Sequence, residues 1–282
     1  MLNWKVKNVI KIEHTEVHGW EPAIRGMRNP MNSWELSDSV LCKGSGGFED
    51  CRVSISGECP RHEDFRDDVF CIGEKDFDLM KRLRNAGTAD RKFMRMITVY
   101  VDLTAPLYWW KEFKTYRAGK RFGDDEPDVF TIPEDYLEYD IEMNSCSTMH
   151  KIHAKEFTLD DFSYEHLMTS VEKAGTELLD VDEVGTNIFV TPKSLLNITI
   201  GCLNNYRKMY LETNDKDWWW QMIQLLPTSY NQKRTVMLNY EVLANMYKSR
   251  KNHKLDEWRD FCHWIESLPY SELITCEKEN EK

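Results

Sequence analysis

The sequence predicts a mixed fold of helices and strands, of the α/β or α+β class. The clearest strand pattern is an alternation of apolar and polar residues that places Ile97, Val99, Val101 and Leu103 on one face. The clearest helix pattern covers residues 74–86 and ends at Gly87, because glycine is common just past helix C-termini. With 282 residues and no internal repeats, the chain is long enough to bury a sizeable core.

The N-terminal half begins with alternating residues over 3–13, which predict a first strand. Residues 19–27 then predict a short amphipathic helix that ends at Asn29-Pro30. Segment 38–72 is rich in glycine, cysteine and acidic residues, so we expect an insertion there. A helix follows the strand at 97–103 and has Pro106 at an early position, where its missing N–H breaks no hydrogen bond.

The C-terminal half opens with a polar, acidic stretch over 120–140, which predicts a second insertion. Helices are then expected over 191–210, 215–226, 235–249 and 259–268. The first of these opens with Thr191-Pro192, a common helix start. We therefore predict a single domain over residues 1–282 that carries the insertions at about 38–72 and 120–140.

Composition limits the partners of the chain. A net charge of −11 argues against a nucleic-acid polymer or an anionic membrane surface, while a local basic pocket for a nucleotide is still allowed. No apolar run approaches the roughly 20 residues that span a bilayer, and the N-terminus lacks a signal-peptide core, so we expect a cytoplasmic protein. The gaps between Cys42, Cys51, Cys59 and Cys71 do not fit zinc-ligand spacing, which predicts reduced thiols and no metal.

The stretch 225–259 carries the strongest functional pattern. In a helix over 235–249 and its extension, one stripe would hold Asn239, Leu243, Met246 and Arg250. The stripe is apolar in the middle and polar at both ends, and a buried amide or guanidinium must find partners. A planar, permanently charged guanidinium suits a phosphate or an imide edge.

This stretch resembles the C-terminal motif region of the flavin-dependent thymidylate synthases, the ThyX family. The matching residues are Leu226-Pro227, Asn239, Asn245, Arg250, His253, Glu257 and Arg259. The spacing from Pro227 to Asn239 to Arg250 matches the family pattern without a gap, and one residue is missing between Arg250 and His253.

A second segment, 105–150, resembles the family's flavin and nucleotide motif with several changes. Lys111 and Glu112 stand where the family has Arg-Gln, and Thr115, Tyr116 and Arg117 stand where it has Arg-His-Arg. Later in this segment Asn144 and Ser147 are kept, but Ser145, Met149 and His150 replace a glutamate, an arginine and a tyrosine. Ile223 replaces a further arginine. The chain resembles divergent members of the family, of the type carried by phages and gut bacteria.

The resemblance implies a FAD-dependent enzyme that transfers a one-carbon unit to a pyrimidine deoxynucleotide such as dUMP. NADPH and methylenetetrahydrofolate are the implied co-substrates, and the implied assembly is a homo-oligomer, expected to be a tetramer. The implied fold has a central, mostly antiparallel sheet flanked by helices, with long C-terminal helices.

The resemblance also assigns roles to individual residues. Ser147 and Arg250 are the implied catalytic residues, and the implied substrate-binding residues are Glu112, Asn144, Ser147 and Arg250. The implied flavin-binding residues are Tyr116, Arg117, Asn239 and Asn245.

Other interpretations of these residues remain open at this point. The lost arginines favour a non-catalytic nucleotide-binding or assembly protein of the same fold. Trp109, Trp110, Phe113 and Tyr116 are more often core or interface residues than a base-stacking platform. Cys146 is a candidate nucleophile. His253 and Glu257 fit an exposed salt-linked pair.

Overall fold

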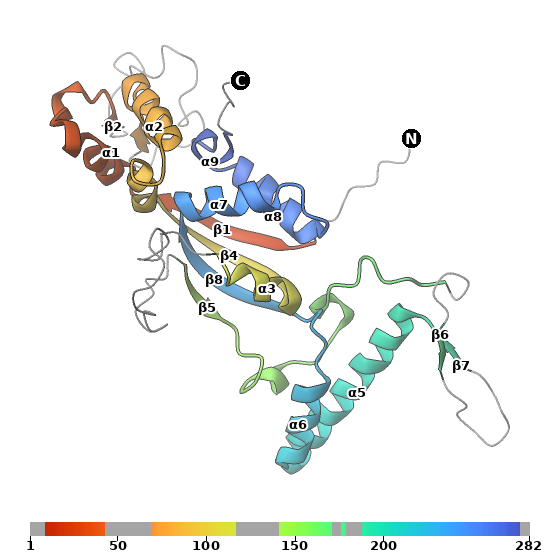
Figure 1. Cartoon of the computed structure of the whole chain (residues 1–282). Helices are drawn as coiled ribbons and strands as arrows, with labels where there is room; N and C mark the ends of the chain where they lie inside the picture. Colours follow the sequence, from red (N-terminus) through yellow and green to blue (C-terminus); the bar gives the residue numbers. More distant parts are fainter. Residues whose placement is uncertain (1–8, 43–68, 117–140, 171–175, 179–187, 277–282) are drawn as a thin grey trace, which may run out of the picture.

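The computed structural model describes residues 9–42, 69–116, 141–170, 176–178 and 188–276, and its centre is a four-stranded antiparallel sheet (Figure 1). The strands lie in the order β1-β4-β8-β5. Their bounds are β1 (Lys11–His18), β4 (Thr98–Pro106), β8 (Asn231–Asn239) and β5 (Glu142–Ser145). Outside this sheet β2 (Val40–Cys42) pairs with β3 (Val69–Cys71), and β6 (Thr176–Leu178) pairs with β7 (Ile188–Val190).

The central strands β4 and β8 have one covered face and one open face. They pair without interruption from Thr98 opposite Asn239 to Pro106 opposite Asn231. Because side chains alternate along a strand, the covered face receives Val99, Val101, Val236 and Leu238, each at most 1% exposed. The more exposed residues between them, such as Tyr100, Asp102 and Thr235, point to the open face. An antiparallel sheet with this pattern needs a covering layer on one side only.

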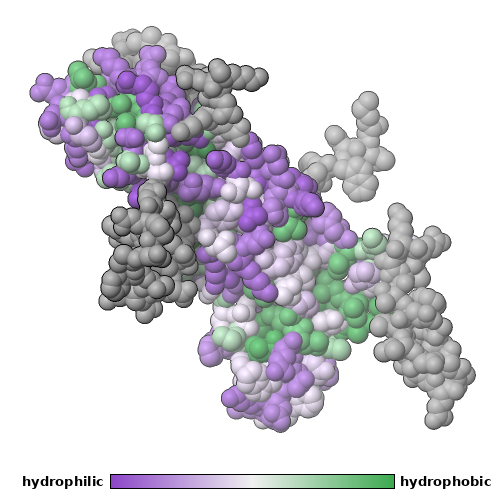
Figure 2. All heavy atoms as spheres, in the orientation of Figure 1, coloured by the Kyte–Doolittle hydropathy of each residue, from purple (hydrophilic) through white to green (hydrophobic). Residues whose placement is uncertain are grey.

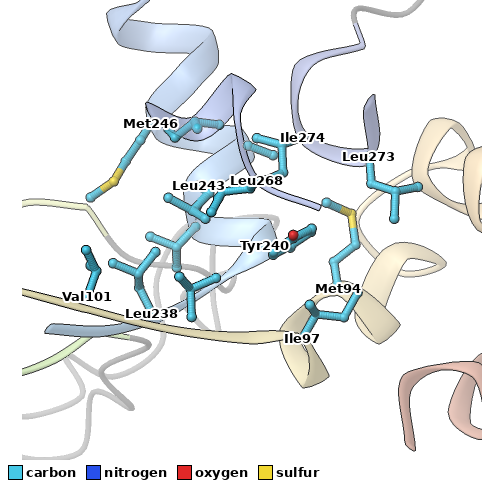
Figure 3. Close-up of a cluster of buried hydrophobic side chains, with 14 of the residues drawn as sticks. Met94, Ile97, Val101, Leu238, Tyr240, Leu243, Met246, Leu268, Leu273 and Ile274 are labelled. Carbon is cyan, nitrogen blue, oxygen red and sulfur yellow. The ribbon is translucent and has the colours of Figure 1, made fainter. Parts of the chain in front are cut away.

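Helices form that covering layer (Figure 1). Over the sheet itself lie α3 (Leu107–Phe113), α7 (Tyr240–Arg250) and α8 (Asp256–Glu266). The layer continues past one end of the sheet with α1 (Trp20–Arg28) and α2 (Glu74–Ala86), and α9 (Glu272–Thr275) packs on α7. In the main core, Leu243 and Met246 of α7 lie over Val101 and Leu238 of the sheet (Figure 3). The predicted core role of Trp109, Trp110 and Phe113 is confirmed, because each is at most 1% exposed.

A helical hairpin projects from the sheet and has a small core of its own (Figure 1). It consists of α5 (Pro192–Thr213) and α6 (Lys216–Leu225). Its core contains Ile152, Phe157, Phe162, Leu196, Ile200, Leu203 and Met222. On the outer side of α5, Leu195 is 50% exposed and Ile198 is 54% exposed. Figure 2 shows an apolar area around this hairpin. None of the described helices combines the length and the apolar character needed to cross a bilayer.

Short 3-10 helices connect the larger elements: η1 (Asn29–Met31), η2 (Trp34–Leu36), η5 (Arg91–Met96), η7 (Ile152–Ala154) and η8 (Leu159–Asp161). Asp76 of α2 holds η2 and the start of β2 against α1. Its carboxylate accepts hydrogen bonds from Arg28 Nε, Ser37 Oγ and Ser39 Oγ, all at 2.6 Å. The N-terminal helices therefore share one buried polar centre.

The mixed fold with an antiparallel sheet and flanking helices is confirmed. The predicted helix at 74–86 and the predicted strand at 97–103 match α2 and β4, and α5 begins at Pro192 with Thr191 as its cap. The helix predicted over 235–249 is wrong in its first part, because residues 235–239 end β8. Their apolar residues alternate as well as they repeat at helical spacing, and pairing with β4 selects the strand.

Three other predictions fall partly or wholly outside the described residues. The strand expected over 3–13 is described from residue 9 onward, and β1 begins at Lys11. The insertion at 38–72 is described at its two ends, which meet as the β2–β3 hairpin. The insertion at 120–140 lies wholly outside the described residues.

Candidate functional site

The candidate site lies where the C-terminal end of α7 meets α3 and α8. α3 follows the end of β4, whereas α7 starts at the opposite end of the sheet and runs back over it (Figure 1). This return brings Arg250, in the last turn of α7, to Glu112 of α3. Arg250 Nη2 lies 3.3 Å from Glu112 Oε2. Two residues from separate motif segments are thus in contact.

Aromatic rings surround the Arg250 guanidinium. Its Cζ atom lies 4.8 Å from the Trp258 ring centre and 5.3 Å from the Tyr116 ring centre. Trp258 Nε1 also donates to Glu112 Oε2 at 3.1 Å, so the carboxylate is held from two sides. Arg250 Nε is buried and has no hydrogen-bond partner among the described residues. The guanidinium is therefore positioned and charged, and it keeps a donor for a further acceptor.

Glu257 of α8 precedes Trp258 in the sequence, is buried, and is not an exposed partner of His253. Its side chain is 3% exposed and accepts a hydrogen bond from the Tyr108 hydroxyl. His253 Nδ1 instead accepts from the backbone N–H of Leu255 at 3.1 Å. Burial and the hydrogen bond to Glu257 raise the pKa of the Tyr108 hydroxyl. The interpretation of His253 and Glu257 as a salt-linked surface pair is therefore wrong.

Asn245 belongs to a second polar cluster on another side of α7. Its Oδ1 accepts from Arg91 Nη2 at 3.5 Å. Glu241, one turn earlier, is 1% exposed and pairs with Arg91 at 3.0 Å and with Arg95. One carboxylate therefore lies between two guanidiniums. Sequence reasoning missed Arg91 and Arg95, whose repeat at helical spacing before β4 was the available signal.

Asn239 does not share a helical stripe with Arg250. It is the last residue of β8 and the N-cap of α7, where its Oδ1 accepts from the backbone N–H of Val242 at 3.0 Å. This cap satisfies one of the free N–H groups at the helix start. The stripe predicted from sequence is wrong at this position, because α7 begins at Tyr240 and Asn239 lies just before it.

Asn144 and Ser147 lie apart from Arg250 within one chain. Asn144 pairs with Thr235 in the register of β5 and β8, and Thr235 pairs with Asp102, so all three share the open face. Arg250 is carried by α7 on the covered face. Ser147 is exposed after β5, and its Oγ accepts from the backbone N–H groups of Met149 and His150 at 3.3 and 2.9 Å.

The remaining predicted site residues lie in different parts of the chain. Tyr116 is half-buried beside Arg250, and Arg117 lies outside the described residues. Cys146 is exposed at the end of β5, where its N–H donates to the Lys233 carbonyl. Among the described residues, no three His, Cys, Asp or Glu side chains gather in an arrangement that could hold a metal ion.

Comparison with known proteins identifies the fold. No protein-family model and no curated protein matches the sequence. Thymidylate synthase X (ThyX) from Helicobacter pylori, with FAD and dUMP, matches in structure with a TM-score of 0.52 and 15% identity, over 95% of this chain and 96% of that chain. Flavin-dependent thymidylate synthase ThyX from Helicobacter pylori, complexed with FAD and dUMP, matches with a TM-score of 0.50 and 14% identity, over 95% and 97%.

A third solved structure is UMP/dUMP methylase PolB from Streptomyces cacaoi, bound with 5-Br dUMP. It has a TM-score of 0.47 and 12% identity over 92% of this chain and 88% of that chain. At such low identities the matches to the two Helicobacter pylori structures establish a common fold. This chain therefore has the ThyX fold.

Proposed function

We propose that this chain is a single-domain, FAD-dependent enzyme that transfers a one-carbon unit to a pyrimidine deoxynucleotide. The observation that carries the proposal is the contact of Arg250 with Glu112 and Tyr116. These residues come from two motif segments far apart in the sequence, and the resemblance to the ThyX family assigns them to the same chemistry. The fold of the chain supports the assignment.

The proposed nucleotide site uses the spare donor and the charge of Arg250. A guanidinium held against two adjoining rings binds a phosphate or the imide edge of uracil with little loss of side-chain entropy. Glu112 orients that guanidinium through their ion pair. Ser147 and Asn144 supply hydrogen-bonding groups that are exposed and thus available to a nucleotide. The substrate can differ from dUMP, since Met149 and Ile223 occupy positions where the resembling family has arginines.

The proposed flavin site uses the cluster around Asn245. Two guanidiniums that share one carboxylate fit the diphosphate of FAD, and the half-buried Asn245 amide lies beside them. Tyr116 and Arg117 are assigned to the flavin edge. Asn239, which caps the start of α7, the helix that carries Asn245, is assigned to flavin binding as well. FAD supplies the redox chemistry when bound, and methylenetetrahydrofolate and NADPH are the proposed carbon donor and reductant. The protein contributes binding, orientation and exclusion of water.

A homo-oligomer, in our proposal a tetramer, would complete the site. Within one chain, Asn144 lies on the open face of the sheet, and Arg250 lies above its covered face. Side chains on opposite faces cannot contact one molecule of substrate from the same sheet, whereas a second copy can supply one of them. Leu195 and Ile198 of α5 expose apolar surface suited to a contact between copies.

The proposal is tested first by flavin retention and nucleotide binding. The purified protein is mixed with excess FAD and desalted, and we expect a visible flavin spectrum to remain. Calorimetric titration with dUMP then compares wild type, Arg250→Ala and the control Arg259→Ala. Loss of a charge-assisted contact should weaken binding about 10- to 150-fold in Arg250→Ala alone.

Arg259 is a suitable control because it is exposed and pairs with Asp256 in its own helix turn. Both variants should keep the wild-type circular dichroism spectrum. Absence of both flavin and dUMP binding in wild type, or equal dUMP affinity in all three proteins, would contradict the proposal.

A non-catalytic nucleotide-binding protein is the second candidate, and one observation favours it. Met149 and Ile223 occupy positions where the resembling family has arginines, so two charges that would hold a reacting nucleotide are absent from these positions. Formation of deoxythymidylate from dUMP, FAD, NADPH and methylenetetrahydrofolate, followed by chromatography, separates the two candidates. Nucleotide binding with no product would support the second one.

A further inference from the structure

Arg234 of β8 is a buried guanidinium that faces no carboxylate among the described residues. Its side chain is on the covered face of the sheet, and the residue is 7% exposed. Nε and Nη2 both donate to Gln232 Oε1, at 3.1 and 2.7 Å. Nη1 lies 3.0 Å from the Met143 sulfur, and the Trp110 ring centre lies 4.3 Å from Cζ. All of these partners are neutral.

Other arginines of the covering layer differ from Arg234 in this respect. Arg28 pairs with Asp76, Arg91 pairs with Glu241, and Arg250 pairs with Glu112. A buried ion without a counter-charge is costly, and a guanidinium stays protonated under all ordinary conditions. Burial lowers the pKa of Arg234, with no neighbouring charge to oppose it. Within the described part of the chain, the position is thus electropositive and lacks an anionic partner.

The hydrogen bonds of Arg234 also leave capacity for a ligand. A guanidinium has five N–H donors, and the bonds described above use one hydrogen on each nitrogen. The bond from Nη1 goes to a thioether, which is a weak acceptor. Met143 is half-buried on the edge strand β5, and its unbranched side chain can turn aside without breaking the backbone pairing. An anion that replaced the sulfur would gain a charge-assisted bond.

The place of Arg234 in the sheet connects it with the proposed nucleotide site. Ser145 is its register partner across β5, and Gln232 Nε2 donates to the Cys146 carbonyl at 2.6 Å. Arg234 therefore lies one strand in from the segment 144–147. It shares the covered face with Ser145 and with Arg250 of the proposed nucleotide site, whereas Asn144 points to the open face. The sequence contains a sign of this site. Arg234 falls at the same alternating position as Val236 and Leu238, where an apolar residue is expected.

We propose that Arg234 binds the phosphate monoester of the pyrimidine nucleotide, with the phosphate displacing the Met143 sulfur from Nη1. This inference rests on the proposed function and deepens it. It assigns to Arg234 the positive charge that is missing at Met149 and Ile223.

The test uses the full chain with Arg234→Met and the control Arg207→Met. Methionine removes the charge and keeps a long side chain. Arg207 is a suitable control because it is half-buried on α5 and donates to a neutral group, the His153 carbonyl, at 2.9 Å. Calorimetric titrations use dUMP and deoxyuridine, and thermal unfolding is followed with and without inorganic phosphate.

In Arg234→Met we expect dUMP affinity to fall about 10- to 150-fold, while deoxyuridine affinity stays at the wild-type value. Inorganic phosphate should raise the Tm of wild type and Arg207→Met but not that of Arg234→Met. The unliganded Tm of Arg234→Met should equal or exceed that of wild type, because replacing a buried charge without a partner is not destabilising.

Three results would overturn the inference: unchanged dUMP affinity in Arg234→Met, a lower unliganded Tm, or failure of this variant to fold. The last two would mean that Arg234 stabilises the unliganded fold through the partners that it already has. If phosphate raises the Tm of wild type but not that of Arg234→Met, and wild type does not bind dUMP, the proposed function is refuted and Arg234 is still an anion site. Wild type that binds neither dUMP nor phosphate would refute both.

Discussion

Replacement of Asp76 by asparagine tests what holds the N-terminal helices on the sheet. The Asp76 carboxylate is fully buried and accepts hydrogen bonds from Arg28 Nε, Ser37 Oγ and Ser39 Oγ. It also accepts from the backbone N–H groups of Asp38 and Ser39 at 3.2 and 3.1 Å. Asparagine has nearly the same size but no charge, and it leaves Arg28, 4% exposed, without its counter-charge.

Removing one partner of a buried ion pair costs about 3–5 kcal/mol of unfolding free energy. In a chain of this size each kcal/mol lowers Tm by about 2–4 °C, so Tm should fall by about 6–20 °C. The surrounding bonds argue for the upper part of this range, because the amide nitrogen of asparagine turns a donor toward groups that also donate.

The same variant should change the pH dependence of stability. Burial raises the pKa of Asp76, but the hydrogen bonds from Ser37, Ser39 and Arg28 outweigh it and hold the pKa below its usual value. An acid with a lowered folded-state pKa stabilises the fold above its unfolded-state pKa of about 3.9. That contribution is lost as pH falls through the folded-state pKa. Wild type should therefore lose stability below about pH 5, and Asp76→Asn should lack this component.

Urea unfolding and calorimetry at pH 7 and at about pH 2, below the unfolded-state pKa, measure both effects. Asp78→Asn is the matched control, because Asp78 lies on the same helix, is 58% exposed and pairs with Lys81. We expect Asp78→Asn to unfold close to wild type at both pH values. Equal urea midpoints for Asp76→Asn and Asp78→Asn at pH 7 would refute the reasoning.

Further variants test the site, the assembly and the second polar cluster. Glu112→Gln removes the charge that orients the Arg250 guanidinium, so dUMP affinity should fall by up to about fivefold, measured by calorimetric titration; equal or tighter binding would contradict this. Ile198→Asp places a charge on the exposed apolar side of α5, and light scattering should show a smaller assembly with an unchanged circular dichroism spectrum; an unchanged mass would exclude that surface. Glu241→Gln leaves two guanidiniums without their buried carboxylate and should lower stability by about 3–5 kcal/mol in urea unfolding; stability equal to wild type would mean that the guanidiniums find other acceptors.

Several elements could be predicted because their signals are local. The helix at α2 ends at Gly87, and α5 begins with Thr191 and Pro192, so both ends are specified within a few residues. The alternation in β4 specifies its covered face in the same way. Glu112, Tyr116 and Arg250 were selected from motif spacing, and the structure brings them together.

The boundary between β8 and α7 could not be predicted from local signals. Residues 235–239 satisfy both a strand alternation and a helical spacing, and their pairing with β4, far away in the sequence, decides between them. The same boundary converts Asn239 from a member of a helical stripe into a helix cap. Glu257 was misread for a related reason, because its burial depends on Tyr108 from another helix.

The sequence by itself determined the mixed class, the ends of the well-capped helices and the identity of the polar residues in the motif segments. The tertiary structure alone decided which of these residues meet. It joined Arg250 to Glu112, joined Asn245 to Arg91, and placed Asn144 on the opposite face of the sheet. It also left Arg234 buried among neutral partners. The physical reason is that propensity and capping act within one or two turns, whereas the partners of a buried charge are set by strand register and by the helices packed above it.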